Sequence, residues 1–164
     1  MRSEPATGQR TDLIGHDRAS LERIMARIGE APFRARQIYR WMYGREAQDF
    51  ETMTDLPQAL RRKLAERFSL HRPEPMQVQD STDGTRKYLL SLREGGKVES
   101  VYMPESGRIT LCISAQIGCA LDCRFCLTAR LGLVRNLSAG EILTQVIILR
   151  RENRDQIGTR PLGS

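Results

Sequence analysis

The cysteines constrain this chain most, because all four lie in one short segment. Cys112 stands first, and Cys119, Cys123 and Cys126 follow it with a C-x3-C-x2-C spacing. Scattered cysteines could cross-link a fold through disulfides, whereas clustered cysteines in a reducing compartment more often hold a metal or carry out redox chemistry. The sequence therefore predicts an inorganic centre bound by thiolates.

The spacing of the last three cysteines suits a [4Fe–4S] cluster, in which each iron takes one external ligand, usually a thiolate. One loop with three cysteines leaves one iron open, and an open iron can chelate the amino and carboxylate groups of S-adenosylmethionine (SAM). The aromatic Phe125 directly before Cys126 is typical of this motif, where the ring borders the adenine of SAM. We therefore expect both cofactors, with Cys119, Cys123 and Cys126 as cluster ligands.

Two other interpretations of the cysteines remain open at this point. A structural zinc site could use Cys112 as its fourth ligand, although such sites usually consist of two closely spaced pairs. A ferredoxin-type cluster usually has a proline after its last cysteine, and Leu127 stands there instead. Taken alone, Cys112 could also be an ordinary buried strand residue.

Helical periodicity dominates the first part of the chain. Residues 1–12 carry no apolar period and are expected to form a disordered tail. Residues 13–70 predict a small helical bundle, with helices over 21–28, over 34–43 and from Pro57 onward.

The period changes to that of strands after residue 70. Asp83-Gly84 and Gly95-Gly96 are turn signals, and they indicate a β-hairpin connector over residues 71–107. The expected strands are 76–79, 86–92, 98–103, which Pro104 should end, and 109–114.

The last part, 108–164, predicts the beginning of a β/α unit. Strand 109–114 leads into the cysteine loop, and Ser138 and Glu141 form a capping-box pattern that opens a helix to about residue 152. The wide apolar face of this helix should pack on a sheet, yet no further strand follows before Ser164. The expected fold class is therefore α+β, leading into the first β/α unit of an incomplete (β/α) barrel, in a fragment of a longer protein.

Composition indicates the class of partner and the cellular location. The net charge of +6 and the pI of about 9.5 favour a polyanionic partner such as nucleic acid. No stretch approaches the ~20 apolar residues that span a membrane, and Met1 to Asp12 resembles no secretory signal. We therefore expect a cytoplasmic protein without membrane association.

Several segments together resemble the bacterial dual-specificity adenine-C2 RNA methyltransferases, the RlmN family of the radical SAM superfamily. The resemblance covers nearly the whole chain from about residue 12, well beyond the cysteine loop that all radical SAM enzymes share. The matching segments are 29–37, 41–43, 53–55, 83–85, 98–105, 110–126 and 135–137. Leu133-Val134 depart from the family pattern, which usually has an aromatic residue and an asparagine there.

The resemblance implies an activity and its partners. Family members methylate C2 of an adenine in the peptidyl-transferase centre of 23S rRNA, and of an adenine beside the anticodon in some tRNAs. One SAM methylates a cysteine near the C-terminus, and a second SAM yields the 5′-deoxyadenosyl radical that activates this methyl group. An electron donor such as flavodoxin or ferredoxin is implied, and a monomer is expected. Another radical SAM substrate, or a non-enzymatic zinc-stabilised RNA-binding module, remains the alternative.

The resemblance also assigns residues. Cys112 matches the cysteine that resolves the protein–RNA adduct by forming a transient disulfide, and Glu99 matches the residue that accepts a proton. The helical domain would handle RNA, with Arg34, Arg36, Arg40 and the run 61–63 as phosphate contacts. Later SAM contacts and the methyl-carrying cysteine would lie beyond Ser164, so the chain as given is expected to be inactive alone.

Overall fold

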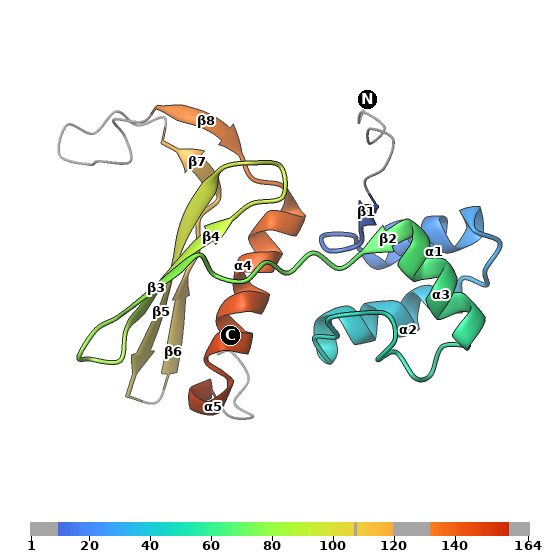
Figure 1. The fold of residues 1–164 in the computed structure, drawn as a ribbon, viewed down its shortest axis with the longest axis horizontal. Helices are drawn as coiled ribbons and strands as arrows, with labels where there is room; N and C mark the ends of the chain where they lie inside the picture. Colours follow the sequence, from blue (N-terminus) through green and yellow to red (C-terminus); the bar gives the residue numbers. More distant parts are fainter. Residues whose placement is uncertain (1–9, 107, 120–131, 158–164) are drawn as a thin grey trace. The chain divides into compact units, whose positions relative to one another are not determined.

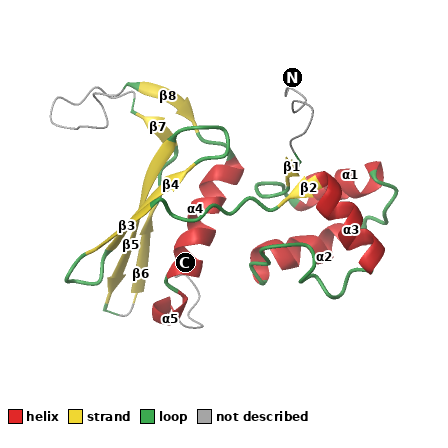
Figure 2. Cartoon of the chain, viewed as in Figure 1, coloured by secondary structure: helices red, strands yellow, loops and turns green. Residues whose placement is uncertain are grey.

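The structure, a computed structural model, describes residues 10–106, 108–119 and 132–157 (Figure 1). The chain divides into two compact units, Met1–His71 and Arg72–Ser164. Helices prevail in the described part of the first unit, and strands prevail in the second (Figure 2). Within the described residues, no helix is long and apolar enough to cross a bilayer.

The first unit is the helical bundle that the sequence predicts. Asp17 caps α1 by accepting a hydrogen bond from the Ser20 amide at 2.8 Å, and Leu21 and Met25 fill the core from its inner face. Pro57 immediately precedes α3, where its fixed φ favours a helix start. The elements are β1 Thr11–Asp12, α1 Arg18–Arg27, α2 Phe33–Tyr39, η1 Arg40–Gly44, α3 Gln58–Arg67 and β2 Phe68–Ser69.

The predicted helix over 34–43 is present but changes its winding. It begins as α2 and continues as the π-helical turn η1, in which the Arg45 amide donates to the Arg40 carbonyl at 3.0 Å. This wider turn buries Trp41 and Met42. Single π turns inside helices are rare and occur frequently at functional sites.

The prediction of a disordered tail over residues 1–12 is wrong for its last two residues, because Thr11 and Asp12 form β1. β1 pairs in parallel with β2, and the Asp12 carboxylate accepts hydrogen bonds from the amides of Ile14 and His71, both at 3.1 Å. β2 and His71 lie far from Asp12 in sequence, so local polarity gave no sign of these contacts. Residues 1–9 lie outside the described part of the chain.

The second unit contains a four-stranded antiparallel sheet in the order β3-β4-β5-β6. The predicted turns at Asp83-Gly84 and Gly95-Gly96 are confirmed, because they join β3 to β4 and β4 to β5. The elements are β3 Gln77–Asp80, β4 Arg86–Ser91, β5 Lys97–Glu105, β6 Arg108–Cys112, β7 Gln116–Gly118, β8 Leu133–Asn136, α4 Ala139–Glu152 and α5 Arg154–Ile157.

Pro104 does not end its strand as expected. β5 runs through Pro104, which pairs with Ile109 of β6. The pairing of β5 with β4 ends at Tyr102, so one side of β5 has no partner strand at Pro104. A proline, which lacks an amide hydrogen, is tolerated at such an edge.

The segment expected to begin a barrel behaves differently. The predicted strand 109–114 is β6, which ends at Cys112 and forms the antiparallel edge of the sheet. The chain then forms β7, which pairs antiparallel with β8 on the far side of the cysteine segment. The sequence did not predict β8, and within the described residues these strands form no parallel barrel unit.

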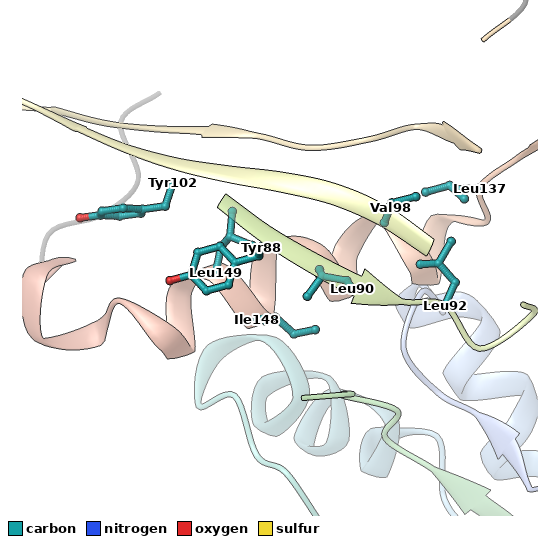
Figure 3. Packing of buried hydrophobic residues seen from close by; sticks show 8 residues of the cluster. All are labelled: Tyr88, Leu90, Leu92, Val98, Tyr102, Leu137, Ile148 and Leu149. Carbon is teal, nitrogen blue, oxygen red and sulfur yellow. The ribbon is translucent and has the colours of Figure 1, made fainter. Parts of the chain in front are cut away.

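The apolar face of α4 finds its sheet within this chain. Ile148 and Leu149 of α4 pack with Tyr88 and Leu90 of β4, and Val98 of β5 completes this part of the core (Figure 3). The capping box that opens α4 is confirmed, because Ser138 and Glu141 bond each other's backbone amides reciprocally. The helix therefore covers one face of the β3–β6 sheet and leaves the other face, called here the outer face, exposed.

Candidate active site

Glu99 and Cys112, the two predicted catalytic residues, share the outer face. Cys112 lies directly opposite Val101 in the register of β5 and β6. Successive side chains of a strand alternate between faces, so Glu99 and Val101 point to the same side as Cys112. Both Glu99 and Cys112 are exposed, and the thiol of Cys112 is free.

Lys87 of β4 completes this group, and the sequence reasoning did not select it. The register places Lys87 opposite Val101, so Lys87, Val101 and Cys112 form one row across three strands. The Lys87 ammonium lies 3.1 Å from the Glu99 carboxylate. Both side chains are partly in water, so this ion pair adds little stability, but it brings a positive charge next to the carboxylate. The alternation of 86–92 was the signal that could have found Lys87.

Cys119 begins the predicted cluster loop, and backbone contacts with Gly132, at the other end of this loop, fix its position. Its amide donates to the Gly132 carbonyl at 3.2 Å. Gly118, with φ +74, lies so close to this carbonyl that a Cβ on Gly118 would stand 1.7 Å from the oxygen. The two ends of the segment between Gly118 and Gly132 therefore meet at a tight backbone contact, called here the loop base.

The other predicted cofactor residues, Cys123, Phe125 and Cys126, lie outside the described residues. Among those the structure does describe, no group of three or more histidine, cysteine or acidic side chains could hold a metal ion. The donor set nevertheless fits a [4Fe–4S] cluster, because three thiolates fall within one segment whose ends are joined. The zinc alternative, with Cys112 as fourth ligand, depends on the same residues, Cys123 and Cys126, outside the described part of the chain.

Arg135 of β8 connects the loop base to the rest of the unit. Its guanidinium makes two hydrogen bonds of 2.7 Å to the carboxylate of Glu141 in α4. It also donates to the Gly95 carbonyl in the β4–β5 turn at 2.9 Å. Glu141 is buried; burial alone raises the pKa of its carboxyl, but hydrogen bonds from Arg135 and Ser138 outweigh burial and leave that pKa below its ordinary value.

The basic residues predicted to meet RNA divide into two groups in the first unit. Arg34 stacks on Phe33, while Arg61 and Lys63 bond to backbone carbonyls and pair with Glu51 and Glu30. Those side chains have internal partners and serve the fold. Arg36, Arg40 and Arg62 are exposed and form no ion pair with any described residue.

Phe33, Arg36 and Arg40 form an exposed stripe on one face of the helix formed by α2 and η1. Their spacing of three and four residues aligns them along the helix. Phe33 is 46% exposed although it is a large apolar side chain. An aromatic ring beside two uncompensated arginines suits stacking on bases and contact with phosphates.

The turn η1 is held to the segment before α3. Trp41 donates from its indole nitrogen to the Asp55 carboxylate at 2.6 Å, and Gln37 donates to the Asp55 carbonyl at 3.2 Å. Arg45 stacks on the Trp41 ring, 4.2 Å from its centre. Gln37, Trp41 and Asp55 belong to the segments that carry the resemblance, and their role here is to fix the helix that presents the stripe.

Comparison with known proteins gives consistent matches. Residues 11–70 match the family described as "Ribosomal RNA large subunit methyltransferase N-terminal domain". The dual-specificity RNA methyltransferase RlmN of Alkalilimnicola ehrlichii is 50% identical over 84% of this chain and 38% of its own length. The RlmN of Erythrobacter litoralis is 44% identical over 97% of this chain and 38% of its own length.

The chain belongs to the RlmN family. A crystal structure of a radical SAM methyltransferase from Sphaerobacter thermophilus has the same fold, with a TM-score of 0.82 and 40% identity over 93% of this chain and 44% of that one. The chain thus spans about two fifths of the length of the RlmN relatives it matches. The RlmN N-terminal domain, at residues 11–70, lies within the first compact unit.

Proposed function

We propose that this sequence acts, within a protein of its relatives' full length, as a radical SAM methyltransferase. The reaction adds a methyl group to C2 of an adenine in 23S rRNA and in some tRNAs. The observation that carries the proposal is the outer face, where one sheet presents both Glu99 and Cys112, at positions that the family uses for catalysis. Close similarity to proteins named RlmN over most of the chain supports it.

Cys119, Cys123 and Cys126 would hold the [4Fe–4S] cluster, and Phe125 would border SAM. When bound, these cofactors supply the radical chemistry that an unreactive aromatic carbon requires. The chain's own contribution is to hold the first ligand, Cys119, at the loop base. Residues 108–164, which include Cys119, would form the start of a partial (β/α) barrel in a protein of the relatives' full length.

Glu99 would accept the proton that leaves adenine C2 after the methyl carbon has joined it. For this role the carboxylate must be reachable, and Glu99 is exposed on the outer face, with the Lys87 ammonium 3.1 Å away. Cys112 would break the protein–RNA adduct: its sulfur, after loss of the thiol proton, bonds to the sulfur of the methyl-carrying cysteine as the bond between that sulfur and the transferred carbon breaks. The electron pair of the broken bond stays with the carbon, which takes up a proton and becomes the methyl group of the released base. A free, exposed thiol on the same face fits that role.

The first unit would handle the RNA, at residues 13–70, and the hairpin connector of 71–107 would link it to the barrel. The exposed stripe of Phe33, Arg36 and Arg40 is the surface that we assign to RNA. A flavodoxin or ferredoxin would supply electrons. We further propose that the protein is a cytoplasmic monomer without membrane association.

The activity can be tested in a chimera. Residues 1–164 would replace the matching part of the A. ehrlichii RlmN, and the chimera would be produced in a bacterium that lacks its own C2 methylation. We expect 2-methyladenine in 23S rRNA by mass spectrometry of nucleosides, and none from the matched Cys126→Ala chimera. A product methylated at C8, or a chimera that is folded and cluster-loaded but inactive, contradicts the proposal.

The cluster can be tested on the chain itself. Anaerobic reconstitution with iron and sulfide should give a brown protein that absorbs near 400 nm and holds about four irons. The Cys112→Ala variant should load equally, because Cys112 is no ligand in this proposal. A colourless protein with one zinc, lost in Cys112→Ala, would instead support the zinc-stabilised module.

A further inference from the structure

Gln145 of α4 has hydrogen-bond partners for every polar group of its side chain. It is fully buried, with 0% exposure. Its amide oxygen accepts from the Ser100 hydroxyl and from the Ser114 amide, both at 2.8 Å. Its amide nitrogen donates to the carbonyls of Ser114 at 2.8 Å and Glu141 at 3.2 Å. These bonds use both donors and both acceptor positions of a glutamine side chain.

Ser114 lies where the chain leaves the sheet. The register that sets Cys112 opposite Val101 would set Ser114 opposite Glu99 if it continued, but β6 ends at Cys112. Gln145 instead bonds both backbone groups of Ser114, as a neighbouring strand would. Only the Ser114 hydroxyl still reaches β5, where it donates to the Glu99 carbonyl at 2.8 Å.

The residues that Gln145 holds are neighbours of both predicted catalytic residues. Ser100 directly follows Glu99, and Ser114 stands two positions after Cys112. We propose that Gln145 is a positioning residue, which fixes the Cys112 thiol and the Glu99 carboxylate relative to one another from the opposite side of the sheet. The inference rests on the proposed function, which gives those two residues their roles.

A merely structural role for Gln145 would change stability alone, so the test measures the coupling between Glu99 and Cys112. The readout is the rate at which iodoacetate, an anionic reagent, alkylates Cys112 in the folded chain, followed anaerobically by peptide mass spectrometry. The Glu99 carboxylate lies on the same face and repels an anion that approaches the thiol. Glu99→Gln should therefore raise this rate by about threefold, as expected for charges on neighbouring strands of a partly solvated surface.

In a Gln145→Met background, the same Glu99→Gln change should have a smaller effect on the rate, because the segment after Cys112 is no longer held beside Glu99 by the bonds to Ser114. Ser114→Ala, which removes only the link to Glu99 and spares the buried amide, should reduce the effect and keeps the test valid if Gln145→Met fails to fold. The matched control is Asn153→Ala. Asn153 is another buried amide, at the end of α4, and it bonds Tyr88 and Arg86 instead. Its loss should cost stability but keep the threefold effect.

The inference is overturned if the Glu99 effect is absent from the unmodified chain, or if it persists at full size in both Gln145→Met and Ser114→Ala. This outcome is independent of methyl transfer. If the chimera is inactive but Glu99 still affects the alkylation of Cys112 through Gln145, only the proposed function is contradicted. If the chimera is active but the effect of Glu99 on Cys112 does not depend on Gln145, only the positioning role is contradicted.

Discussion

Among single residues, Arg135 connects three separate segments near the cysteine loop: β8, the β4–β5 turn and α4. It belongs to β8, directly beyond the loop base, and bonds both the β4–β5 turn and the first turn of α4. Its partner Glu141 is only 6% exposed, so the carboxylate depends on Arg135 and Ser138 in place of water. An ionised group in such a position is costly when its partner is removed.

Arg135→Ala should therefore lower the free energy of unfolding by about 2 kcal/mol, less than for a fully buried pair because Arg135 itself is partly exposed. Urea denaturation of the chain measures this change. Arg108→Ala is the matched control, because its pair with Glu105 is exposed on both sides and should contribute very little to stability. Equal effects of the two substitutions would contradict the role of Arg135.

The stability lost in Arg135→Ala should also depend on pH. In the native chain the pKa of Glu141 lies below its ordinary value of 4.5, so its contribution to stability is complete above that pH and is lost as the pH falls below it. Without Arg135, this pKa loses the hydrogen bonds and the positive charge that contribute most to lowering it, so the contribution of Glu141 to stability becomes smaller. The difference in unfolding free energy between the two proteins should shrink below about pH 4.5. In a Glu141→Gln background the difference should no longer depend on pH.

Single residues also show how far the sequence alone predicts this site. Alternation places Glu99 and Cys112 on strands, but the register that sets Cys112 opposite Val101 depends on turn and bulge geometry. Gln145 was missed because one amide in an apolar helical run looks like a surface residue. Its main partner, Ser114, is 31 positions away, and no local pattern reports such a contact.

Elements differ in how far local chemistry determines them. The start of α4 follows from the capping box of Ser138 and Glu141, which acts within one helical turn. β8 was not predicted, because its four residues show no clean alternation, and Leu133 and Val134 remain exposed. This strand exists through its pairing with β7 across the cysteine segment. Pairing between distant segments of this kind cannot be predicted from the periodicity of apolar residues along the sequence.

The tight contact at the loop base can be tested by substituting its two glycines. Gly118→Ala would force a Cβ against the Gly132 carbonyl, in a left-handed conformation that alanine already disfavours. We expect a loss of about 3 kcal/mol in unfolding free energy, together with poor cluster reconstitution at Cys119. Gly132→Ala is the control: its φ is also positive, but no described atom lies within 4 Å of the added carbon. It should cost about 1 kcal/mol and load normally.

At the scale of the whole molecule, charge alone does not locate an RNA surface. Each compact unit carries thirteen basic and ten acidic residues, so the net charge of +6 is divided evenly. What distinguishes the first unit is arrangement, since several of its predicted phosphate contacts have internal partners, whereas Arg36 and Arg40 of the exposed stripe form no ion pair with any described residue. The contacts that matter are therefore those without an internal partner.

The last prediction follows from that arrangement. Arg36→Ala combined with Arg40→Ala should weaken binding of the chain to a tRNA transcript, and should reduce the slope of log K against log salt by about 1.5, since each phosphate contact contributes about 0.7 to 0.9. Filter binding over a series of salt concentrations measures both. Arg18→Ala with Arg27→Ala removes the same charge from exposed positions on α1. If both pairs lower the slope equally, the chain binds RNA through its overall charge and the stripe has no special part.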